Sequence, residues 1–417
     1  MNVLVMGNGG REHALVWALA RSKSVGKIFA YPGNAGTADA AENIPAPLAD
    51  PEWETLISAC RKHRIDWVFV GPEQPLTDGV VDALAAAGVP AFGPHEQAAQ
   101  LEGSKSFSKD FMLRNGIPTA AAATVHTMDQ LEAELEKRPG MVVLKKSGLA
   151  AGKGVLESAD REELRAFAEA VLRSDTIVVE DYLNGFEVSL FTLSNGQDYL
   201  LLPPCADYKK AGDGNTGPNT GGMGSITPVP WFSDKDLQTS IQTIIQPTHD
   251  ALRKEGLAYA GVLYFGLMIT GDGPKLLEYN VRFGDPETQI LLPLLDGDFG
   301  SMCKSLLDGA LPEIQLAYNA AVTVVAAAPG YPGEYPRHLP ARITPGRQDN
   351  GMIYHASTLF SEDRTVLTNG GRCFTATGWG DTLEQARATA YQQLEGLEFR
   401  GMQYRSDIGL RVLQSSR

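Results

Sequence analysis

Cysteine is scarce in this sequence. Four cysteines occur among 417 residues, they lie far apart, and no two of them form a C-x-x-C pair: Cys60, Cys205, Cys303 and Cys373. This number and spacing indicate neither a disulfide framework nor a zinc site. Free thiols fit a reducing compartment, so we expect a cytoplasmic protein.

Positive charge and long apolar runs are also in short supply. The chain has 36 basic and 50 acidic residues, a formal net charge of -14, which gives no support for a nucleic acid partner. No apolar run reaches the roughly 18 to 20 residues that cross a bilayer, so no membrane partner is expected. With 43% hydrophobic and 21% charged residues, the composition is that of a globular protein of two to four domains.

The common nucleotide-binding fingerprints are incomplete. In GNGGREH, residues 7–13, Glu12 stands where the dinucleotide fingerprint G-x-G-x-x-G has its third glycine, which disfavours a nicotinamide cofactor. Residues 148–153 are one residue too short for a Walker loop, and Gly154 stands where that loop has a metal-binding Ser or Thr. We also find no convincing triad around a Ser, Cys or His nucleophile. Any phosphate ligand is therefore expected to be bound by neither a dinucleotide fingerprint nor a Walker loop.

Strand and helix patterns alternate over the first 100 residues. The apolar run 3–6 precedes the glycine turn 7–13 and a helical pattern, and further strands are predicted at 27–31 and 67–70. This alternation predicts a doubly wound parallel sheet. Ligands of such sheets collect at the carboxyl ends of the strands, where the glycine turn and Glu73 fall. A plain connection between strand and helix would show the same glycines.

A basic, small-residue segment follows a predicted strand at 141–145. Residues 145–155 carry three lysines among glycines and alanines, a composition that favours a flap over polyphosphate but also occurs in mobile surface turns. Upstream, Ser104 is expected to cap a helix that carries Lys105. The segment therefore predicts one side of a phosphate site.

The strongest chemical signal is LLEYNVRFGDPETQ, residues 276–289, which forms a predicted β-hairpin with the apolar run 262–269. Alternate residues of a strand share a face, so Glu278, Asn280 and Arg282 are expected together on a polar face. The opposite face is then apolar: Leu277, Tyr279, Val281 and Phe283. A carboxylate and an amide oxygen ~7 Å apart suit a hard cation such as Mg²⁺, and arginine is a fixed fork for carboxylate or phosphate. An ordinary half-exposed strand would show the same Glu-x-Asn spacing.

A glycine-rich polar loop runs over residues 213–224, shortly after Asp207. Five of its twelve residues are glycine, too many for packing, and a loop of this length in a compact protein is usually functional or disordered. A helix is predicted at 233–255, with a kink at Pro247.

The pattern of predicted elements changes again after residue 312. Strands are predicted at 322–325, 353–356 and 373–377, followed by a helix that Asp381 and Glu384 are expected to cap. This pattern predicts a small α+β domain with few candidate catalytic groups. The polar turn 404–409 is interpreted as structural.

Taken in order, these motifs resemble the ATP-grasp ligases, and specifically the glycinamide ribonucleotide synthetase family, also called phosphoribosylamine–glycine ligases. The resemblance runs nearly end to end and rests on GNGGREH (7–13), YPGNAG (31–36), VGPE (70–73), GLAAGKG (148–154), GPNTGGMG (217–224) and RFGDPE (282–287). It implies an N-terminal doubly wound domain (1–101), a central ATP-grasp fold of two α+β subdomains (102–320) with a flap subdomain at about 118–188, and a C-terminal α+β domain (321–417).

The resemblance implies a reaction as well. Members of the family join 5-phosphoribosylamine to glycine with ATP, giving glycinamide ribonucleotide, ADP and phosphate through glycyl phosphate in purine biosynthesis. The implied cofactor is Mg²⁺ or Mn²⁺, ATP is a cosubstrate, and a monomer or dimer is expected.

Individual residues receive roles from the same resemblance. Glu278 and Asn280 would bind the metal, and Arg282, Asp207 and Lys145 are the catalytic candidates. The implied ATP-binding residues are Lys105, Lys145, Ser147, Gly148, Gly152, Lys153, Gly154, Glu180, Asp181, Tyr182, Leu183 and Glu187, with adenine at 180–183 and ribose at Glu187. The residues implied for phosphoribosylamine are Gly9, Gly10, Arg11, Glu12 and Glu73, and those for glycine are Asp207, Thr220, Gly221, Gly222 and Arg282.

The sequence departs from the family pattern at two places. Lys146 and Ser147 stand where the family usually has Ala-Asp, and Phe186 stands where it often has an acidic residue. Two other interpretations stay open: another ATP-grasp carboxylate–amine ligase or purine carboxylase, and a catalytically silent nucleotide-binding regulator. The presence of Glu278 and Asn280 argues against a silent protein, which is free to lose its metal ligands.

Overall fold

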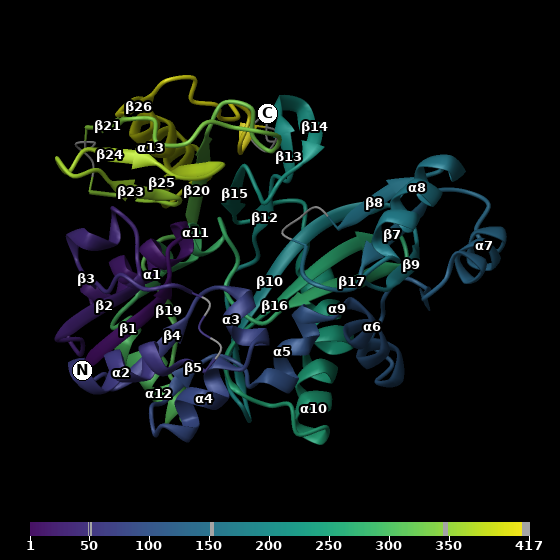
Figure 1. The fold of residues 1–417 in the computed structure, drawn as a ribbon, viewed down its shortest axis with the longest axis horizontal. Helices are drawn as coiled ribbons and strands as arrows, with labels where there is room; N and C mark the ends of the chain where they lie inside the picture. Colours follow the sequence, from purple (N-terminus) through teal and green to yellow (C-terminus); the bar gives the residue numbers. More distant parts are fainter. Residues whose placement is uncertain (49, 51, 151–153, 345–348, 411–417) are drawn as a thin grey trace.

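The computed structural model describes residues 1–410 except 49, 51, 151–153 and 345–348. Four larger sheets form its framework, two of five strands and two of four. Figure 1 shows the C-terminal strands above the N-terminal sheet at the left, and a small lobe that projects at the right. Among the described residues, no helix has the length and apolar character needed to cross a membrane.

The N-terminal sheet is parallel, with the strand order β3-β2-β1-β4-β5. Its central strand, β1 (Asn2–Gly7), buries Val3, Leu4, Val5 and Met6 completely, because helices cover both faces of a parallel sheet. The sheet's other strands are β2 (Lys27–Pro32), β3 (Glu42–Asn43), β4 (Trp67–Val70) and β5 (Ala91–Phe92). Its helices are α1 (Gly10–Ala20), α2 (Glu54–His63), α3 (Glu73–Thr77) and α4 (Val80–Ala86). The predicted doubly wound sheet is confirmed.

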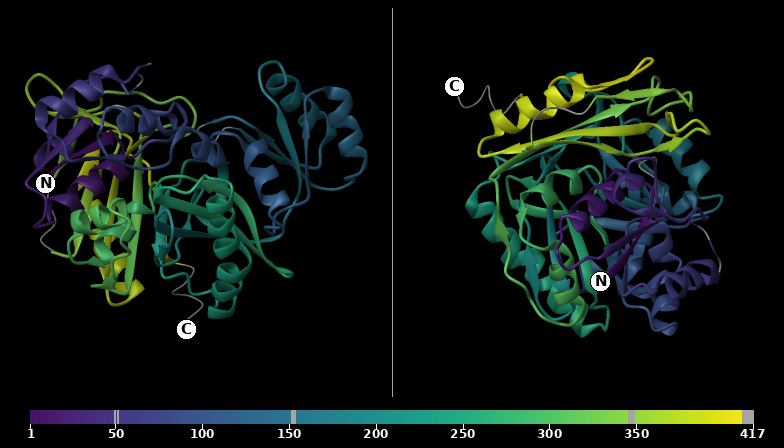
Figure 2. Two further views of the ribbon diagram at one scale, coloured as in Figure 1. Left: turned by 90° about the horizontal axis from the view of Figure 1, so that it is seen from below. Right: turned by 90° about the vertical axis from the view of Figure 1, so that its left-hand side faces the viewer.

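The small lobe is built on an antiparallel sheet of order β6-β9-β7-β8. Its elements are β6 (Ala122–Val125), α7 (Met128–Glu136), β7 (Val142–Lys146), β8 (Val155–Ser158), α8 (Arg161–Val171) and β9 (Ile177–Asp181). The lobe has a hydrophobic core of its own, to which Leu131, Leu144 and Leu164 belong. Figure 2 shows it extending away from the rest of the chain, and a lobe with a separate core is suited to move as a body.

Two helices lead from the N-terminal sheet to this lobe, α5 (Glu96–Gly103) and α6 (Lys105–Arg114). Ser104 lies between them, and its side chain accepts a hydrogen bond from the backbone N–H of Phe107. This N-cap confirms the predicted start of the helix that carries Lys105.

The second four-stranded sheet has the order β11-β10-β16-β17. Its strands are β10 (Gly185–Asn195), β11 (Tyr199–Leu201), β16 (Ala260–Thr270) and β17 (Gly273–Asn280), so the predicted hairpin is confirmed. In place of one kinked helix, α9 (Asp234–Ser240) and α10 (Gln246–Lys254) are joined by the π-helical turn η3 (Ile241–Ile245). The turn directly precedes Pro247, which has no N–H for the helical ladder.

One detail of the hairpin prediction is wrong. A register shift between Gly266 and Leu267 places Glu278 opposite Gly266 and Leu276 opposite Leu267, which leaves Leu277 unpaired. Such a bulge reverses the alternation of side chains. Leu276 is therefore the fully buried residue, whereas Leu277 is half-buried.

The C-terminal sheet has the order β12-β15-β20-β25-β22 and is covered by α13 (Leu383–Glu395). Its strands are β12 (Ala206–Asp207), β15 (Gly224–Thr227), β20 (Ala320–Ala327), β22 (Gly351–His355) and β25 (Arg372–Gly380). Strands β12 and β15, which lie on either side of the glycine-rich loop in the sequence, thus both belong to this sheet, an arrangement that the sequence did not predict. The cap of α13 was also predicted wrongly: Thr382, not Asp381, accepts the hydrogen bond from the N–H of Gln385.

Smaller elements complete the fold. They are η1 (Thr37–Asp39), β13 (Lys210–Gly212), η2 (Asp213–Asn215), β14 (Thr216–Asn219), α11 (Thr288–Leu291), η4 (Leu292–Leu294), β18 (Leu295–Asp296), α12 (Phe299–Leu307), β19 (Gln315–Leu316), β21 (Ala341–Ile343), β23 (Thr358–Phe360), β24 (Val366–Thr368) and β26 (Leu397–Phe399). The proposed domain boundaries near residues 101 and 320 stay predictions.

Arg405 connects the C-terminal turn to the segment that precedes the glycine-rich loop. Its side chain is 1% exposed, pairs with Asp407 at 2.7 Å, donates to the carbonyl of Lys210 at 3.0 Å and lies over the ring of Tyr208. Replacing Arg405 with alanine leaves Asp407 without its ion-pair partner, and we expect a loss of about 3 kcal/mol in the free energy of unfolding. Urea unfolding measures this value. Arg400→Ala, on the exposed surface, is the matched control and is expected to change it by less than about 0.5 kcal/mol.

Candidate active site

A cleft of about 540 Å³ lies where the four sheets meet. The N-terminal part contributes Arg11, the small lobe Lys145, the hairpin Glu278 and the C-terminal sheet Asp207 and Arg372. Residues from distant parts of the sequence therefore line one site.

Buried lysines occupy the side of the cleft next to the small lobe. Lys145 and Lys109 both pair with the carboxylate of Glu180, at 2.9 and 3.0 Å. Burial raises the pKa of Glu180, but the two lysines outweigh this effect and hold its pKa below the ordinary value. Lys105 donates to the carbonyl of Gly148 at 3.3 Å, at the start of the predicted flap. Three cations thus gather where a polyphosphate would need them.

Most of the predicted ATP-binding residues line this cleft: Lys105, Lys145, Gly154, Glu180, Asp181, Tyr182, Leu183 and Glu187. Ser147 and Gly148 lie beside it, and the Ser147 hydroxyl is 3.0 Å from that of Ser106. Gly152 and Lys153 lie outside the described residues. Glu187, predicted to bind ribose, is ion-paired with Lys209.

Glu278 and Asn280 both line the cleft from β17. Among the described residues, neither side chain has a hydrogen-bond or ion-pair partner within the protein, so their oxygens are available to a ligand. Their hard oxygen donors fit a cation such as Mg²⁺, which completes its coordination with water and phosphate oxygens. The described part of the chain holds no cluster of three or more His, Cys, Asp or Glu side chains arranged for a metal.

Arg282 lies at the end of β17 between two carboxylates. Its Nη2 pairs with Glu102 at 2.7 Å, its Nε lies 3.5 Å from Glu73, and its Nη1 donates to the carbonyl of Phe283 at 3.2 Å. Within the described residues, the buried Nε of Arg282 and the buried Oδ1 of Asp207 lack a hydrogen-bond partner. Burial raises the pKa of Asp207 to about 8. A donor and an acceptor in the same cleft are thus left for a ligand.

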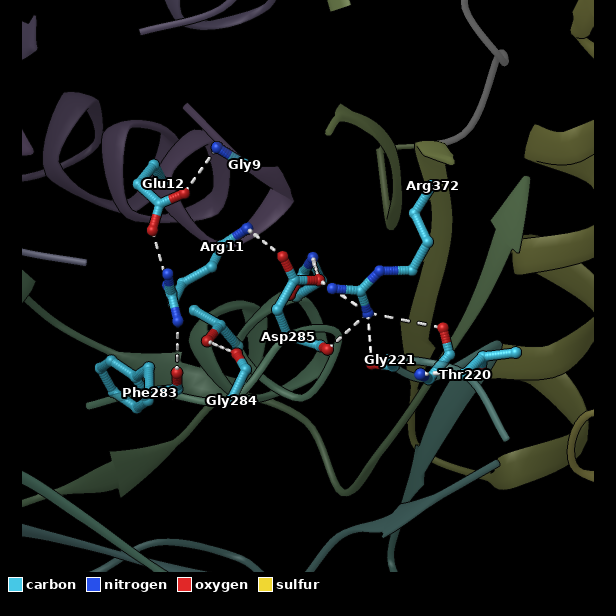
Figure 3. Close-up of polar contacts among 12 residues, drawn as sticks. Gly9, Arg11, Glu12, Thr220, Gly221, Phe283, Gly284, Asp285 and Arg372 are labelled. Carbon is cyan, nitrogen blue, oxygen red and sulfur yellow. Dashed lines mark hydrogen bonds and ion pairs between the residues drawn. The ribbon is translucent and has the colours of Figure 1, made fainter. Parts of the chain in front are cut away.

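The glycine turn is organised by Glu12 (Figure 3). The Glu12 carboxylate is 2% exposed, accepts from the N–H of Gly9 and from Nε of Arg11, both at 2.6 Å, and Arg11 also donates to the carbonyl of Phe283. Arg11 and Glu73 line the cleft, whereas Gly9, Gly10 and Glu12 lie beside it. At the position of the fingerprint's third glycine, this chain therefore has a glutamate that holds the turn through hydrogen bonds.

Arg372 is a cleft residue that the sequence analysis missed. Its Nη1 donates to the carbonyls of Gly221 at 2.5 Å and of Asp285 at 2.7 Å, and Figure 3 shows Arg11 and Arg372 on either side of Asp285. Thr220 and Gly221, predicted for glycine, line the cleft, while Gly222 lies behind them and donates to Thr220 Oγ1 at 3.0 Å. Other lining residues without a predicted role include Glu102, Lys109, Lys209, Asp285, Glu287 and Tyr331. The RFGDPE motif signalled Asp285 and Glu287; no local motif signals Glu102 or Arg372.

Two antiparallel sheets that enclose a cleft with lysines on one wall and a carboxylate–amide pair on the other define an ATP-grasp protein. Models of the N domain, the ATP-grasp (A) domain and the C domain of phosphoribosylglycinamide synthetase match residues 1–102, 103–288 and 321–411. The chain belongs to the phosphoribosylglycinamide synthetase family, and the predicted resemblance is confirmed.

Individual relatives agree with this assignment. A phosphoribosylamine–glycine ligase of Halalkalibacterium halodurans is 40% identical over 420 residues, 99% of this chain and 97% of the relative. The trifunctional purine biosynthetic protein adenosine-3 of Gallus gallus is 44% identical, over 99% of this chain and 42% of that longer protein. The crystal structure of a phosphoribosylamine–glycine ligase from Thermotoga maritima superposes with a TM-score of 0.83 at 34% identity, covering 98% of this chain and all of that one.

Proposed function

We propose that this chain carries out its family's reaction, the ATP-dependent joining of glycine to 5-phosphoribosylamine in purine biosynthesis. The observation that carries the proposal is a pair of buried cleft atoms without a hydrogen bond to any described residue: Asp207 Oδ1, and Arg282 Nε, which lies 3.5 Å from Glu73. Glycine is a zwitterion whose carboxylate suits the arginine and whose ammonium group suits the aspartate. A buried donor and acceptor without partners destabilise the empty site, so a ligand that satisfies both is bound selectively.

The first step uses the phosphate side of the cleft. An oxygen of the glycine carboxylate attacks the γ-phosphorus of ATP, the bond to ADP breaks, and glycyl phosphate forms. Lys105 and Lys145 neutralise the phosphates, and adenine lies along residues 180–183. Glu187 must leave Lys209 to reach the ribose hydroxyls. Glu278 and Asn280 would hold Mg²⁺ or Mn²⁺, which supplies charge neutralisation for the transferred phosphoryl group.

The second step uses the N-terminal side. The neutral amine of phosphoribosylamine attacks the carbonyl carbon of glycyl phosphate, phosphate leaves, and the nitrogen loses a proton. Arg11 and Glu73 are placed to hold this substrate, while Gly9, Gly10 and Glu12 shape the turn behind them. The protein supplies alignment and exclusion of water rather than a nucleophile of its own. Closure of the small lobe over the cleft would exclude that water.

The remaining proposals follow from the same family assignment. They are a cytoplasmic location, a monomeric or dimeric state, and domain boundaries near residues 101 and 320. Each is open to a separate measurement.

Phosphate release tests the function. With ATP, Mg²⁺, glycine and freshly generated phosphoribosylamine, we expect release that falls to background when any one component is omitted, because the two steps share one intermediate. Mass spectrometry should identify a glycine-containing ribonucleotide. Release supported by bicarbonate in place of glycine would indicate a carboxylase, and nucleotide binding without any turnover would indicate a silent regulator.

A further inference from the structure

Glu102 occupies an unusual position for a carboxylate. It lies near the end of α5, just before Ser104 and Lys105, and is 7% exposed although it borders the cleft. Both of its oxygens are used by the protein: Oε1 pairs with Arg282 Nη2 at 2.7 Å, and Oε2 accepts from the N–H of Val281 at 2.8 Å. With both oxygens occupied, Glu102 is placed to orient its neighbours rather than to bind substrate.

The contacts of Arg282 show what this orientation achieves. Guanidinium is planar and presents its donors in a fixed fork. Glu102 holds Nη2, and the Phe283 carbonyl holds Nη1, so two of the three nitrogens are fixed within the protein. The buried Nε remains without a hydrogen bond to any described residue. Glu102 thus sets which edge of Arg282 is left for a ligand.

Glu73 does not duplicate this role. The side chain of Glu73 is 34% exposed and lies 3.5 Å from Arg282 Nε, whereas that of Glu102 is 5% exposed and forms the shorter contact. Arg282 is thus flanked by one fixed carboxylate and one that is more accessible to the cleft. Arg11, Lys105 and Tyr259 also face this group of charges. Burial raises the pKa of Glu102 to about 7, so a proton on this group would weaken its hold on the arginine.

We propose that Glu102 is a positioning residue for glycine activation: it fixes Arg282 and ties the helix pair that carries Lys105 to the end of β17. The proposal rests on the function proposed above, in which Arg282 receives the glycine carboxylate. Through Val281 and Arg282, Glu102 holds the backbone and the side chain of adjacent residues at once. No motif of the sequence marks it, because its partners lie 179 and 180 positions away.

The first half-reaction tests the proposal without phosphoribosylamine. Full-length enzyme is incubated with ATP, Mg²⁺, glycine and hydroxylamine, which attacks glycyl phosphate at the carbonyl carbon and releases phosphate, leaving glycyl hydroxamate. Glu102→Gln keeps the size but replaces one acceptor oxygen with a donor. We expect kcat/KM for glycine to fall about 100-fold, as expected for a misplaced catalytic group, while the KM for ATP changes less than about twofold. Glu102→Asp is expected to recover about a tenth of the wild-type value.

Two controls separate positioning from general damage. Glu96→Gln, an exposed change on the same helix, should retain wild-type rates. In an Arg282→Lys background, Glu102→Asp should cost less than about twofold, because residues that act through one another are not additive. Equal losses in kcat/KM from Glu102→Asp in the wild-type and Arg282→Lys backgrounds would overturn the proposal. This comparison tests the proposal even if Glu102→Gln does not fold. Wild-type rates for Glu102→Gln would overturn it too, whereas a wild-type enzyme without glycine-dependent ADP formation would instead refute the proposed function.

Discussion

Replacing Glu278 with alanine is expected to lower kcat by about 1000-fold or more while the fold survives. Glu278 lines the cleft on β17 and has no partner among the described residues, so its removal breaks no internal pair. It does remove a hard anionic ligand from the only carboxylate–amide pair proposed for the cation. Without that ligand, the charge on the transferred phosphoryl group is poorly neutralised.

The measurement is ATP-, glycine- and phosphoribosylamine-dependent phosphate release at saturating Mg²⁺, with thermal unfolding as the check on the fold. Asp272→Asn, at the exposed tip of the same hairpin, is the control and should leave kcat unchanged. Near wild-type turnover of Glu278→Ala in metal-replete buffer would refute the assignment of this residue to the metal.

Asp207→Asn should reduce kcat/KM for glycine by about 100-fold. The carboxylate lies in the cleft with one buried oxygen unpartnered, and an amide offers the glycine ammonium group no charge. The KM for ATP should change little, because the lysines that we propose to bind phosphate lie on another wall. Asp110→Asn, exposed on α6, provides a matched carboxylate-to-amide control.

The pH dependence of glycine binding is a second signature of Asp207. Burial raises its pKa to about 8, and the charged groups facing it are Lys209, Glu287, Glu187 and Arg372. Because the ammonium group needs the ionised form, the KM for glycine should rise by up to about tenfold for each pH unit below 8. Asp207→Asn should abolish this slope, and an unchanged slope in the variant would assign the titration to another group.

The same pKa has a consequence for stability with the opposite sign. Between the ordinary pKa of 3.8 and about 8, the folded protein holds a proton on Asp207 that the unfolded chain has lost. Unfolding releases that proton, so the contribution of this group to stability falls as pH rises through this window and is lowest above pH 8. Asp207→Asn should therefore be more stable than the wild type at high pH, although it is less active. Urea unfolding at pH 6 and pH 9 measures the difference.

Local sequence patterns predicted the elements well where the signal was local. The apolar run of β1, the cap at Ser104 and the hairpin that carries Glu278 all follow from neighbouring residues. The N-cap of α13 was misplaced by one residue, because Asp381 and Thr382 are adjacent and both are residue types that cap helices; Thr382 is the cap in the structure. The bulge at Leu277 depends on pairing with β16, which strand periodicity alone does not contain.

The site was predictable only in part for the same reason. Glu278 and Asn280 share a strand, so their common face follows from a period of two. Arg372 reaches Gly221 and Asp285 across 151 and 87 positions of the chain, and Glu102 reaches Arg282 across a similar span. Neither residue has a neighbour in the sequence that indicates its role, because tertiary packing alone brings these groups together.

The pairing of β15 with both β12 and β20 has a consequence for modularity. Residues 206–227 enter the C-terminal sheet from the middle of the chain, and Arg372 and Arg405 bind them from the other side. A chain cut near residue 320 would leave β15 with an open edge that invites aggregation. In chimeras between relatives, segments 206–227 and 320–410 should therefore be exchanged together. A crossover that separates them would combine strands and contacting side chains from two different proteins in one sheet.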